Sequence, residues 1–336
     1  MAEYLTSTTD LTKVASAIRE KGGTSDPLVY PDGFVTAIGN IQTGVAKPKW
    51  VESTLPIGGS WTSVCYGNGK FVAVNGNMTN AIIYSTDGIN WTSASLPVYG
   101  YWESVCYGND KFVAVARDNS YVVYSTDGIH WTSASLPGTQ DWMSVCHGNG
   151  KFVTVSSNND IAAYSIDGIF WSSARMPIGG SWTSVCYGNG KFVAVAYNSD
   201  IAAYSTDGIN WTESALLSGA RQWESVCYGN GKFVAVPSTG YKLYAYSTDG
   251  IHWTQSMSPV SGYWYSVCYG NGKFVAVAYN SDIAVYSIDG INWTQTSMPI
   301  SAAWSPVGYG DGKFVAIATN TSTVSAYLKD SFDEWQ

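Results

Sequence analysis

A tryptophan that recurs at an almost constant interval constrains the fold more than any other feature of this sequence. It stands at Trp61, Trp102, Trp142, Trp182, Trp223, Trp264 and Trp304. The successive differences are 41, 40, 40, 41, 41 and 40 residues. Such a fixed period indicates a repeat architecture, in which each copy is one supersecondary unit that buries its apolar face against its neighbours.

Each repeat contains four short apolar or alternating segments separated by turn residues. In the fourth copy these segments are residues 182–187, 192–196, 201–204 and 211–214. The first connection contains Gly188-Asn189-Gly190 and the third contains Asp207-Gly208, which are typical of tight turns with positive φ. Four strands in about forty residues is the spacing of a propeller blade. Seven copies therefore predict an all-β fold, a seven-bladed β-propeller over residues 45–336.

The two ends of the repeat region bear on how such a ring closes. Residues 49–52 look like a fourth strand without the three strands that should precede it. The last repeat reaches Trp335 and stops, so it has almost no outer strand of its own. We expect residues 50–53 to supply that strand and close the ring. The alternative is that Trp335 occupies the site.

The composition excludes several classes of protein. The 336 residues include 15 Trp and 24 Tyr, and disordered chains lack such aromatic content. The formal net charge of -8 argues against a nucleic-acid partner, because phosphate binding needs clustered Lys and Arg. No apolar run reaches the roughly eighteen residues of a membrane span, so no membrane insertion is expected. The N-terminus also lacks the layout of a secretory signal.

Six cysteines share one repeat position, four residues after the repeat tryptophan. They are Cys65, Cys106, Cys146, Cys186, Cys227 and Cys268, and the seventh copy has Gly308 instead. Equivalent positions on neighbouring units lie farther apart than the roughly 7 Å that a disulfide allows. We expect free thiols that pack as small hydrophobic side chains, which fits assembly in a reducing cytosol. A ring of metal-binding thiolates is the alternative.

Residues 1–44 do not belong to the repeats. Asp10 can cap a helix that ends at Gly22-Gly23, and a second short helix is expected after Pro31. Two short helices bury little surface alone, so we expect this segment to attach to a neighbouring protein or to its own copies in a homo-oligomer. Residues 42–48 resemble a linker.

The same segment carries a family resemblance. Residues 11–24 (LTKVASAIREKGGT) and 30–38 (YPDGFVTAI) resemble the N-terminal segment of tail-fibre and tail-associated proteins of phages and prophages of Gram-positive gut bacteria. The resemblance implies that residues 1–44 attach the protein to other tail or baseplate proteins, while the rest faces the host. It also implies a location in the virion tail, assembled in the host cytoplasm. An ordinary oligomerisation hairpin is the alternative.

A second motif, Ser-Xaa-Asp-Gly-Xaa-Xaa-Trp, marks the third connection of six copies. It occupies residues 85–91, 125–131, 165–171, 205–211, 247–253 and 287–293. The motif resembles a shortened Asp-box, the turn between the third and fourth strands of sialidase-like propellers. This resemblance supports the blade assignment without implying catalysis. We expect each aspartate to accept hydrogen bonds from backbone amides of its own turn.

The side chains of the repeats do not match the arrangement of known glycosidases. Sialidases use an arginine triad, whereas Arg117, Arg175 and Arg221 occupy different repeat positions. Other glycosidases need two carboxylates about 5–10 Å apart. Glu103 and Glu224 are repeat-equivalent, but blades two and five are not adjacent. No histidine pattern or nucleophile motif is typical of a metal or catalytic site. We therefore expect no catalytic residue, no metal and no cofactor.

Comparison of the copies separates a uniform face from a variable one. The first and third connections hardly change, and they lie on one face because strands alternate in direction. The second and fourth connections lie on the opposite face and vary, as does the residue after the repeat tryptophan. The variable positions are rich in Tyr, Asn, Asp, Ser and Arg, a composition typical of antibody paratopes. It also suits sugars, since Tyr stacks on their C–H surfaces and Asn or Asp binds their hydroxyls.

We expect the variable face to bind a bacterial cell-surface receptor, either a glycan or a protein, with carbohydrate favoured. The expected contacts are Tyr101, Arg117, Asp118, Tyr197, Asp200, Arg221, Tyr241, Tyr263, Tyr265, Tyr279 and Asp282. The retention of Tyr-Asn-Ser-Asp at 197–200 and 279–282 favours binding over drift. Recent duplication explains part of the likeness, since residues 56–74 and 177–195 are identical.

Four alternatives stay open. The first is a multivalent lectin-like binding protein that does not come from a phage, and the second is loop drift without any ligand. The third is a purely structural spacer, and the fourth is a glycosidase-like enzyme.

Overall fold

The computed structural model describes residues 49–157, 159–197, 199–215, 222–320 and 322–329. The chain divides into two units, Met1–Lys47 and Pro48–Gln336. The first unit, with the helices expected in residues 1–44, lies outside the described residues, as do Arg221 and Trp335. Within the described ranges the structure is all β, and no helix there is long and apolar enough to cross a membrane.

The structure contains the following strands. The first are β1 (Trp50–Gly59), β2 (Trp61–Gly67), β3 (Lys70–Asn75), β4 (Thr79–Ser85), β5 (Thr92–Gly108), β6 (Lys111–Arg117), β7 (Asn119–Ser125), β8 (Thr132–Gly148), β9 (Lys151–Ser157), β10 (Asn159–Ser165), β11 (Ser172–Gly188), β12 (Lys191–Tyr197), β13 (Ile201–Ser205) and β14 (Thr212–Ala215). The others are β15 (Trp223–Gly229), β16 (Lys232–Pro237), β17 (Leu243–Ser247), β18 (Thr254–Met257), β19 (Trp264–Gly270), β20 (Lys273–Ala278), β21 (Ser281–Ser287), β22 (Thr294–Ala302), β23 (Trp304–Gly310), β24 (Lys313–Ala318) and β25 (Ser322–Lys329).

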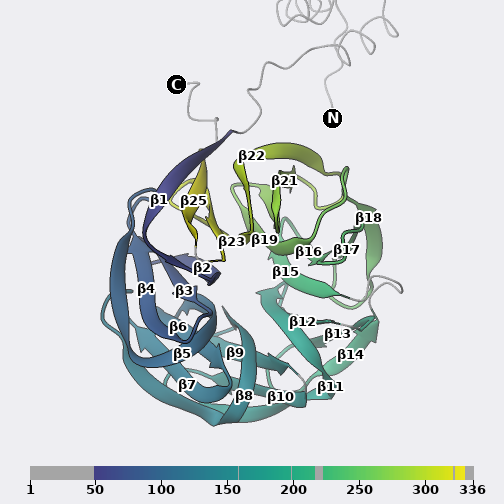
Figure 1. The fold of residues 1–336 in the computed structure, drawn as a ribbon. Coiled ribbons are helices and arrows are strands. Elements are labelled where there is room, and N and C mark those ends of the chain that lie inside the picture. Colours follow the sequence, from purple (N-terminus) through teal and green to yellow (C-terminus); the bar gives the residue numbers. More distant parts are fainter. Residues whose placement is uncertain (1–48, 158, 198, 216–221, 321, 330–336) are drawn as a thin grey trace, which may run out of the picture. The chain divides into compact units, whose positions relative to one another are not determined.

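The strands pair antiparallel in groups of four that surround a common centre (Figure 1). The groups are β2-β3-β4-β5, β5-β6-β7-β8, β8-β9-β10-β11, β11-β12-β13-β14, β15-β16-β17-β18, β19-β20-β21-β22 and β23-β24-β25-β1. The long strands β5, β8 and β11 each end one group with their first half and begin the next with their second half. This is the architecture of a β-propeller, so the predicted all-β propeller fold is confirmed.

The last blade takes its outer strand from the other end of the repeat region. Trp50 pairs with Leu328 and Ser53 with Ser325 in the antiparallel ladder between β1 and β25. The Trp50 side chain is only 2% exposed and packs in the core between that blade and the preceding one. The prediction that residues 50–53 supply the missing strand is therefore confirmed.

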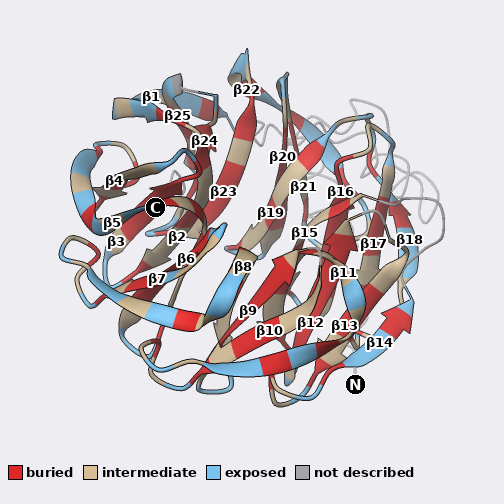
Figure 2. Ribbon diagram, turned by 60° about the horizontal axis from the view of Figure 1, so that its bottom comes forward, coloured by how far each residue is buried: buried red, intermediate tan, exposed pale blue. Residues whose placement is uncertain are grey.

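The hydrophobic core lies between consecutive blades. Val72 and Val74 of β3, for example, pack in one cluster with Trp102 and Val105 of β5 in the next blade. The second strand of each blade is buried on both faces, and in most blades it is an unbroken apolar run, as in residues 192–196 of β12. Figure 2 shows how the buried residues follow the strands inside the ring while exposed residues gather on outer strands and turns.

A glycine at the end of each inner strand lies against an aromatic ring of the next blade. The pairs are Gly67 with Tyr107, Gly108 with His147, Gly148 with Tyr187, Gly188 with Tyr228, Gly229 with Tyr269, Gly270 with Tyr309 and Gly310 with Tyr66. A Cβ at any of these glycines would overlap the ring. The final pair joins the last blade to the first, so the contacts form a closed circle.

The turns on the uniform face have the geometry that their sequence predicts. Asn189 and Gly190 adopt φ values of 45° and 74° in the first connection of their blade. In the third connection, Asp207 Oδ1 accepts hydrogen bonds from the backbone N–H groups of Ile209 and Asn210, both at 2.8 Å. Burial raises the pKa of Asp207, but these hydrogen bonds outweigh it and hold the pKa well below its usual range. The structural role expected for this aspartate is confirmed.

The six cysteines are free, and each packs partly buried against a core between blades. Burial raises the pKa of each thiol. They behave as the small hydrophobic side chains that the repeat position predicts.

Candidate ligand-binding site

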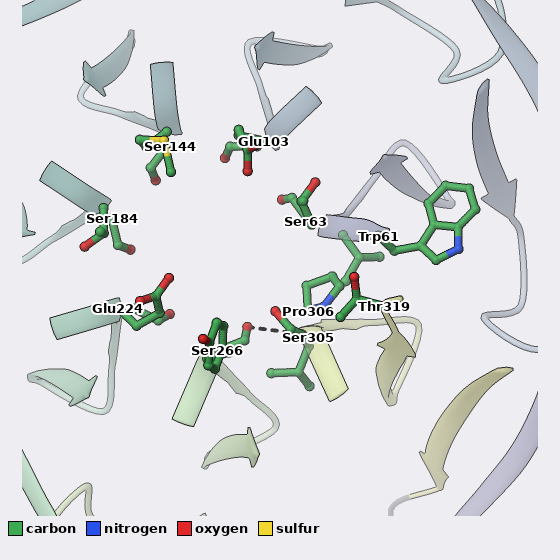
Figure 3. A pocket seen from close by; sticks show the side chains of 18 of the residues that line it. Trp61, Ser63, Glu103, Ser144, Ser184, Glu224, Ser266, Ser305, Pro306 and Thr319 are labelled. Carbon is green, nitrogen blue, oxygen red and sulfur yellow. Dashed lines mark hydrogen bonds between the residues drawn. The ribbon is translucent and has the colours of Figure 1, made fainter. Parts of the chain in front are cut away.

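A pocket of about 350 Å³ lies at the centre of the ring, where the inner strands begin (Figure 3). Second-connection residues, among them Tyr279 and Asn320, also line it, so it belongs to the variable face. Each blade contributes the residue that follows its repeat tryptophan. These residues are Thr62, Glu103, Met143, Thr183, Glu224, Tyr265 and Ser305. One pocket therefore collects a repeat position that differs from copy to copy.

A ring of serines fixes the wall of this pocket. The serine two residues after the tryptophan accepts a hydrogen bond from a valine N–H of the next blade. The pairs are Ser63 with Val105, Ser104 with Val145, Ser144 with Val185, Ser184 with Val226, Ser225 with Val267 and Ser266 with Val307, at 3.1 to 3.2 Å. Pro306 occupies the equivalent position in the last blade. The pocket wall is thus tied together across blades, which holds its side chains in place.

Glu103 forms an ion pair beside the pocket. Its Oε1 lies 3.0 Å from Nε of Arg117, whose guanidinium lies 5.0 Å from the centroid of the Tyr101 ring. Burial raises the pKa of Glu103 to about 7, although Arg117 lowers it; the charge of Glu224 adds to the rise. Arg117 therefore compensates only part of the cost of placing this carboxylate away from water.

Glu224 holds the same repeat position in another blade but has a different partner. The Ser238 hydroxyl donates a hydrogen bond of 3.1 Å to Glu224 Oε2. Ser238 and Arg117 are themselves repeat-equivalent, since each stands fifteen residues after its blade's tryptophan. Burial raises the pKa of Glu224 to about 7, and the serine hydrogen bond offsets only part of that rise. Figure 3 shows Glu103 and Glu224 directed into the same space.

Two tyrosines form an aromatic part of the wall. The rings of Tyr265 and Tyr279 lie with centroids 4.8 Å apart and planes inclined by 30°. Asn320 Nδ2 donates a hydrogen bond of 2.7 Å to the Tyr279 hydroxyl and so orients that ring. Burial, followed by the charge of Glu224, raises the pKa of Tyr265. The aromatic pair and the Glu224 carboxylate therefore act on the same part of the pocket.

The structure places the predicted contacts at different distances from this centre. Tyr265 and Tyr279 line the pocket, and Tyr101 and Arg117 support Glu103 next to it. Around the pocket, the Asp118 N–H donates a hydrogen bond to Asp141 Oδ1, and Tyr197 forms an isolated antiparallel β-bridge with Gln222. Asp200 lies on a second connection, whereas Asp282 lies at the start of β21. Tyr241 and Tyr263 are 62% and 55% exposed. Arg221 lies outside the described residues.

The prediction missed Glu103 and Glu224 as members of one site. Their blades are not adjacent, but in a ring this does not keep two residues from lining the same pocket. Every inner strand starts near the same axis, so residues at one repeat position face each other whichever blades carry them. The variability of the position after the tryptophan was the signal that could have identified both.

No family model and no curated protein matches this chain. Among the residues that the structure describes, no group of His, Cys, Asp and Glu is arranged to hold a metal ion.

Several solved structures are similar. Virginiamycin B lyase from Staphylococcus aureus has a TM-score of 0.75 at 13% identity, over 84% of this chain and 99% of that one. A streptogramin B lyase gives 0.73 at 12% identity, covering 83% and 97%. The WD40 β-propeller domain of Doa1 gives 0.66 at 12% identity, covering 86% and 99%. At such low identity the likeness shows the fold alone, and by that fold the chain is a β-propeller.

Proposed function

We propose that this protein is a phage tail receptor-binding protein whose propeller binds a bacterial surface carbohydrate through the central pocket and the variable connections around it. One observation carries the proposal. The seven variable residues that follow the repeat tryptophans, with three residues of second connections, line one pocket, whereas the first and third connections of the opposite face stay nearly uniform. The ring geometry brings these positions together, and their variation gives the pocket aromatic, acidic and hydroxyl groups that suit a ligand.

The chemistry of the pocket supports a sugar as ligand. Its volume of about 350 Å³ falls within the range of about 300–1,000 Å³ that is typical of small-ligand sites. Tyr265 and Tyr279 offer aromatic surface for the C–H faces of a sugar ring. Glu103, Glu224 and Thr319 offer acceptors and a hydroxyl for sugar hydroxyls. Binding without catalysis is part of this proposal.

The proposal includes seven blades and attachment through residues 1–44. The seven repeat tryptophans and the closed circle of glycine–aromatic contacts support the blade number. The resemblance of residues 11–24 and 30–38 to phage tail proteins supports attachment to other tail or baseplate proteins. A location in the virion tail follows from that attachment.

Binding of the full-length protein to cell-wall fractions of Gram-positive bacteria tests the proposal. Tyr265→Ala should weaken the binding by about tenfold, because a stacked aromatic side chain contributes on the order of 1–2 kcal/mol. Phe170→Ala is the matched control, since Phe170 is 79% exposed in a third connection of the opposite face. Equal binding by wild type and Tyr265→Ala would contradict a site in the pocket.

Glycoside hydrolysis is a second candidate, and one observation favours it. Glu103 and Glu224 share a pocket, and burial raises the pKa of both to about 7, where a carboxyl group can exchange protons at neutral pH. Release of reducing ends from cell-wall polysaccharide measures this activity. Release that stops in both Glu103→Gln and Glu224→Gln would favour the enzyme; binding without release favours the receptor-binding protein.

A further inference from the structure

We propose that Glu224 and the Tyr265–Tyr279 pair form a subsite for the primary ammonium group of an amino sugar. This inference rests on the proposed carbohydrate-binding function and specifies which sugar chemistry the pocket selects. It comes from comparing two copies of one repeat position, which hold the same carboxylate in two different charge environments.

In the first copy the protein neutralises the carboxylate itself. Glu103 is paired with Arg117 at 3.0 Å, and that guanidinium is held over Tyr101. In the second copy the position of Arg117 is taken by Ser238, which offers one neutral hydrogen bond to Glu224. Among the residues that the structure describes, no cationic side chain pairs with Glu224. Within the described ranges, Glu224 is therefore a pocket carboxylate without a counterion.

A carboxylate that is removed from water without a counterion is unfavourable, and a cation placed beside it recovers part of that free energy. The pKa of Glu224, raised by burial to about 7, reflects this cost. A ligand ammonium group carries the missing charge and three N–H donors, whereas Ser238 uses only one acceptor site of the carboxylate.

The neighbouring groups favour a cation over an anion. Glu103 and Tyr265 face Glu224, and Asp118 and Asp141 add negative charge near Glu103. Arg117, the cationic side chain that the structure describes near Glu103, is already paired with that carboxylate. An anion beside Glu224 would therefore also be repelled by Glu103, whereas a cation would be attracted by both carboxylates.

The tyrosine pair contributes in two ways. Aromatic faces attract ammonium groups, and they also stack on the C–H surface of a sugar ring. Tyr265 lies close enough for the charge of Glu224 to raise its pKa after the effect of burial, and Asn320 fixes the orientation of Tyr279. A sugar stacked on this pair presents an amine substituent toward Glu224. An amino sugar thus matches both the carboxylate and the aromatic pair, whereas a simple cation would leave the stacking surface for the sugar ring unused.

The test exchanges the partners of the two copies. Binding of a glucosamine trimer and of its fully N-acetylated counterpart to the full chain is measured by calorimetry at pH 7. The wild type should prefer the free amine by about tenfold, the size expected for one charge-assisted hydrogen bond. Glu224→Gln should abolish that preference, and Ser238→Arg should abolish it too, because it recreates the Glu103–Arg117 pair. Arg117→Ser should strengthen binding of the free amine. Unfolding midpoints verify that each variant is folded.

The remaining outcomes are also decisive. Failure of the wild type to bind the glucosamine trimer, equal binding of both trimers, or a preference that survives Ser238→Arg would overturn the proposal. A preference that emerges only in Arg221→Gln would overturn it as well, because Arg221 would then be the counterion. Equal binding of trilysine would overturn the assignment to a sugar. Cell-wall binding is measured in parallel: if it persists while the trimers are not distinguished, the ammonium subsite fails and the proposed function stands.

Discussion

The two faces of the propeller are built from the same repeat but differ in how their residues are held. On the uniform face, turn residues bind the neighbouring blade. The side chain of Asn68 donates to the carbonyl of Thr126, and that of Asn189 donates to the carbonyl of Thr248. Each such residue serves two blades at once, so a substitution would disturb both.

On the variable face, side-chain hydrogen bonds between neighbouring blades occur in some copies of the repeat and are replaced in others. Thr62 and Thr183 donate hydrogen bonds to the carbonyls of Trp102 and Trp223 in the next blade, at 2.6 and 2.7 Å. Other copies place Glu, Met, Tyr or Ser at this position, and their blades have the same strand pairing. A position whose inter-blade bond is dispensable is free to change, and this freedom is what allows the central pocket to acquire its own chemistry.

Closure of the ring supports both faces, so breaking it should give the largest effect. Trp50→Ala should lower the free energy of unfolding by about 3–5 kcal/mol, the usual cost of truncating a buried Trp. Val51→Ala is the control, because Val51 lies in the same strand and is 38% exposed. Denaturant unfolding measures both. Equal stability of Trp50→Ala and wild type would contradict closure of the ring by β1.

One glycine from each face tests whether substitutions cost more stability on the uniform face than on the variable face. Gly188→Ala places a Cβ into the ring of Tyr228 and should cost about 3 kcal/mol, near the upper end for overpacking. Gly179 lies in the same long strand, and a Cβ there would only just touch the backbone of Asn159 at 3.9 Å. Gly179→Ala should therefore change stability by less than about 0.5 kcal/mol. Comparable losses in the two variants would remove the distinction between the faces.

The sequence predicted the parts of the molecule that every copy repeats. Period, turn chemistry and the incomplete last repeat led to the propeller and to closure by residues 50–53, because the same local interactions recur in each blade. The pocket was harder to predict, since it depends on which side chains meet across the axis. Glu103 and Glu224 lie far apart along the chain, and the partner that distinguishes them stands fourteen residues after each one.

Glu224, on the variable face, should also lower the free energy of unfolding at neutral pH. The folded pKa of Glu224, about 7, lies above its value of about 4.3 in an unfolded chain, so the folded state holds the proton more tightly. The contribution of the Glu224 carboxyl group to the free energy of unfolding is thus largest below about pH 4, and it is lost as the pH rises to about 7. Glu224→Gln should be more stable than wild type by about 2 kcal/mol at pH 8, with little difference at pH 4.

Thermal or urea unfolding at both pH values measures this difference. The matched control is Glu213→Gln, which makes the same substitution at an exposed position of β14. A Glu224→Gln variant whose stability follows the wild-type profile at every pH would show that the carboxylate is not withdrawn from water in the folded protein.

The smallest effect is expected at Tyr197, which shares the Tyr-Asn-Ser-Asp sequence with Tyr279 but not its position in the site. Tyr279 lines the pocket, contacts Tyr265 and receives the Asn320 hydrogen bond, whereas Tyr197 bridges to Gln222 outside the pocket lining. Tyr279→Ala should weaken cell-wall binding by about tenfold, and Tyr197→Ala by about threefold or less. Equal losses would mean that binding extends over the whole variable face, as several similar weak sites would require. A loss at Tyr279 alone would concentrate recognition at the central pocket.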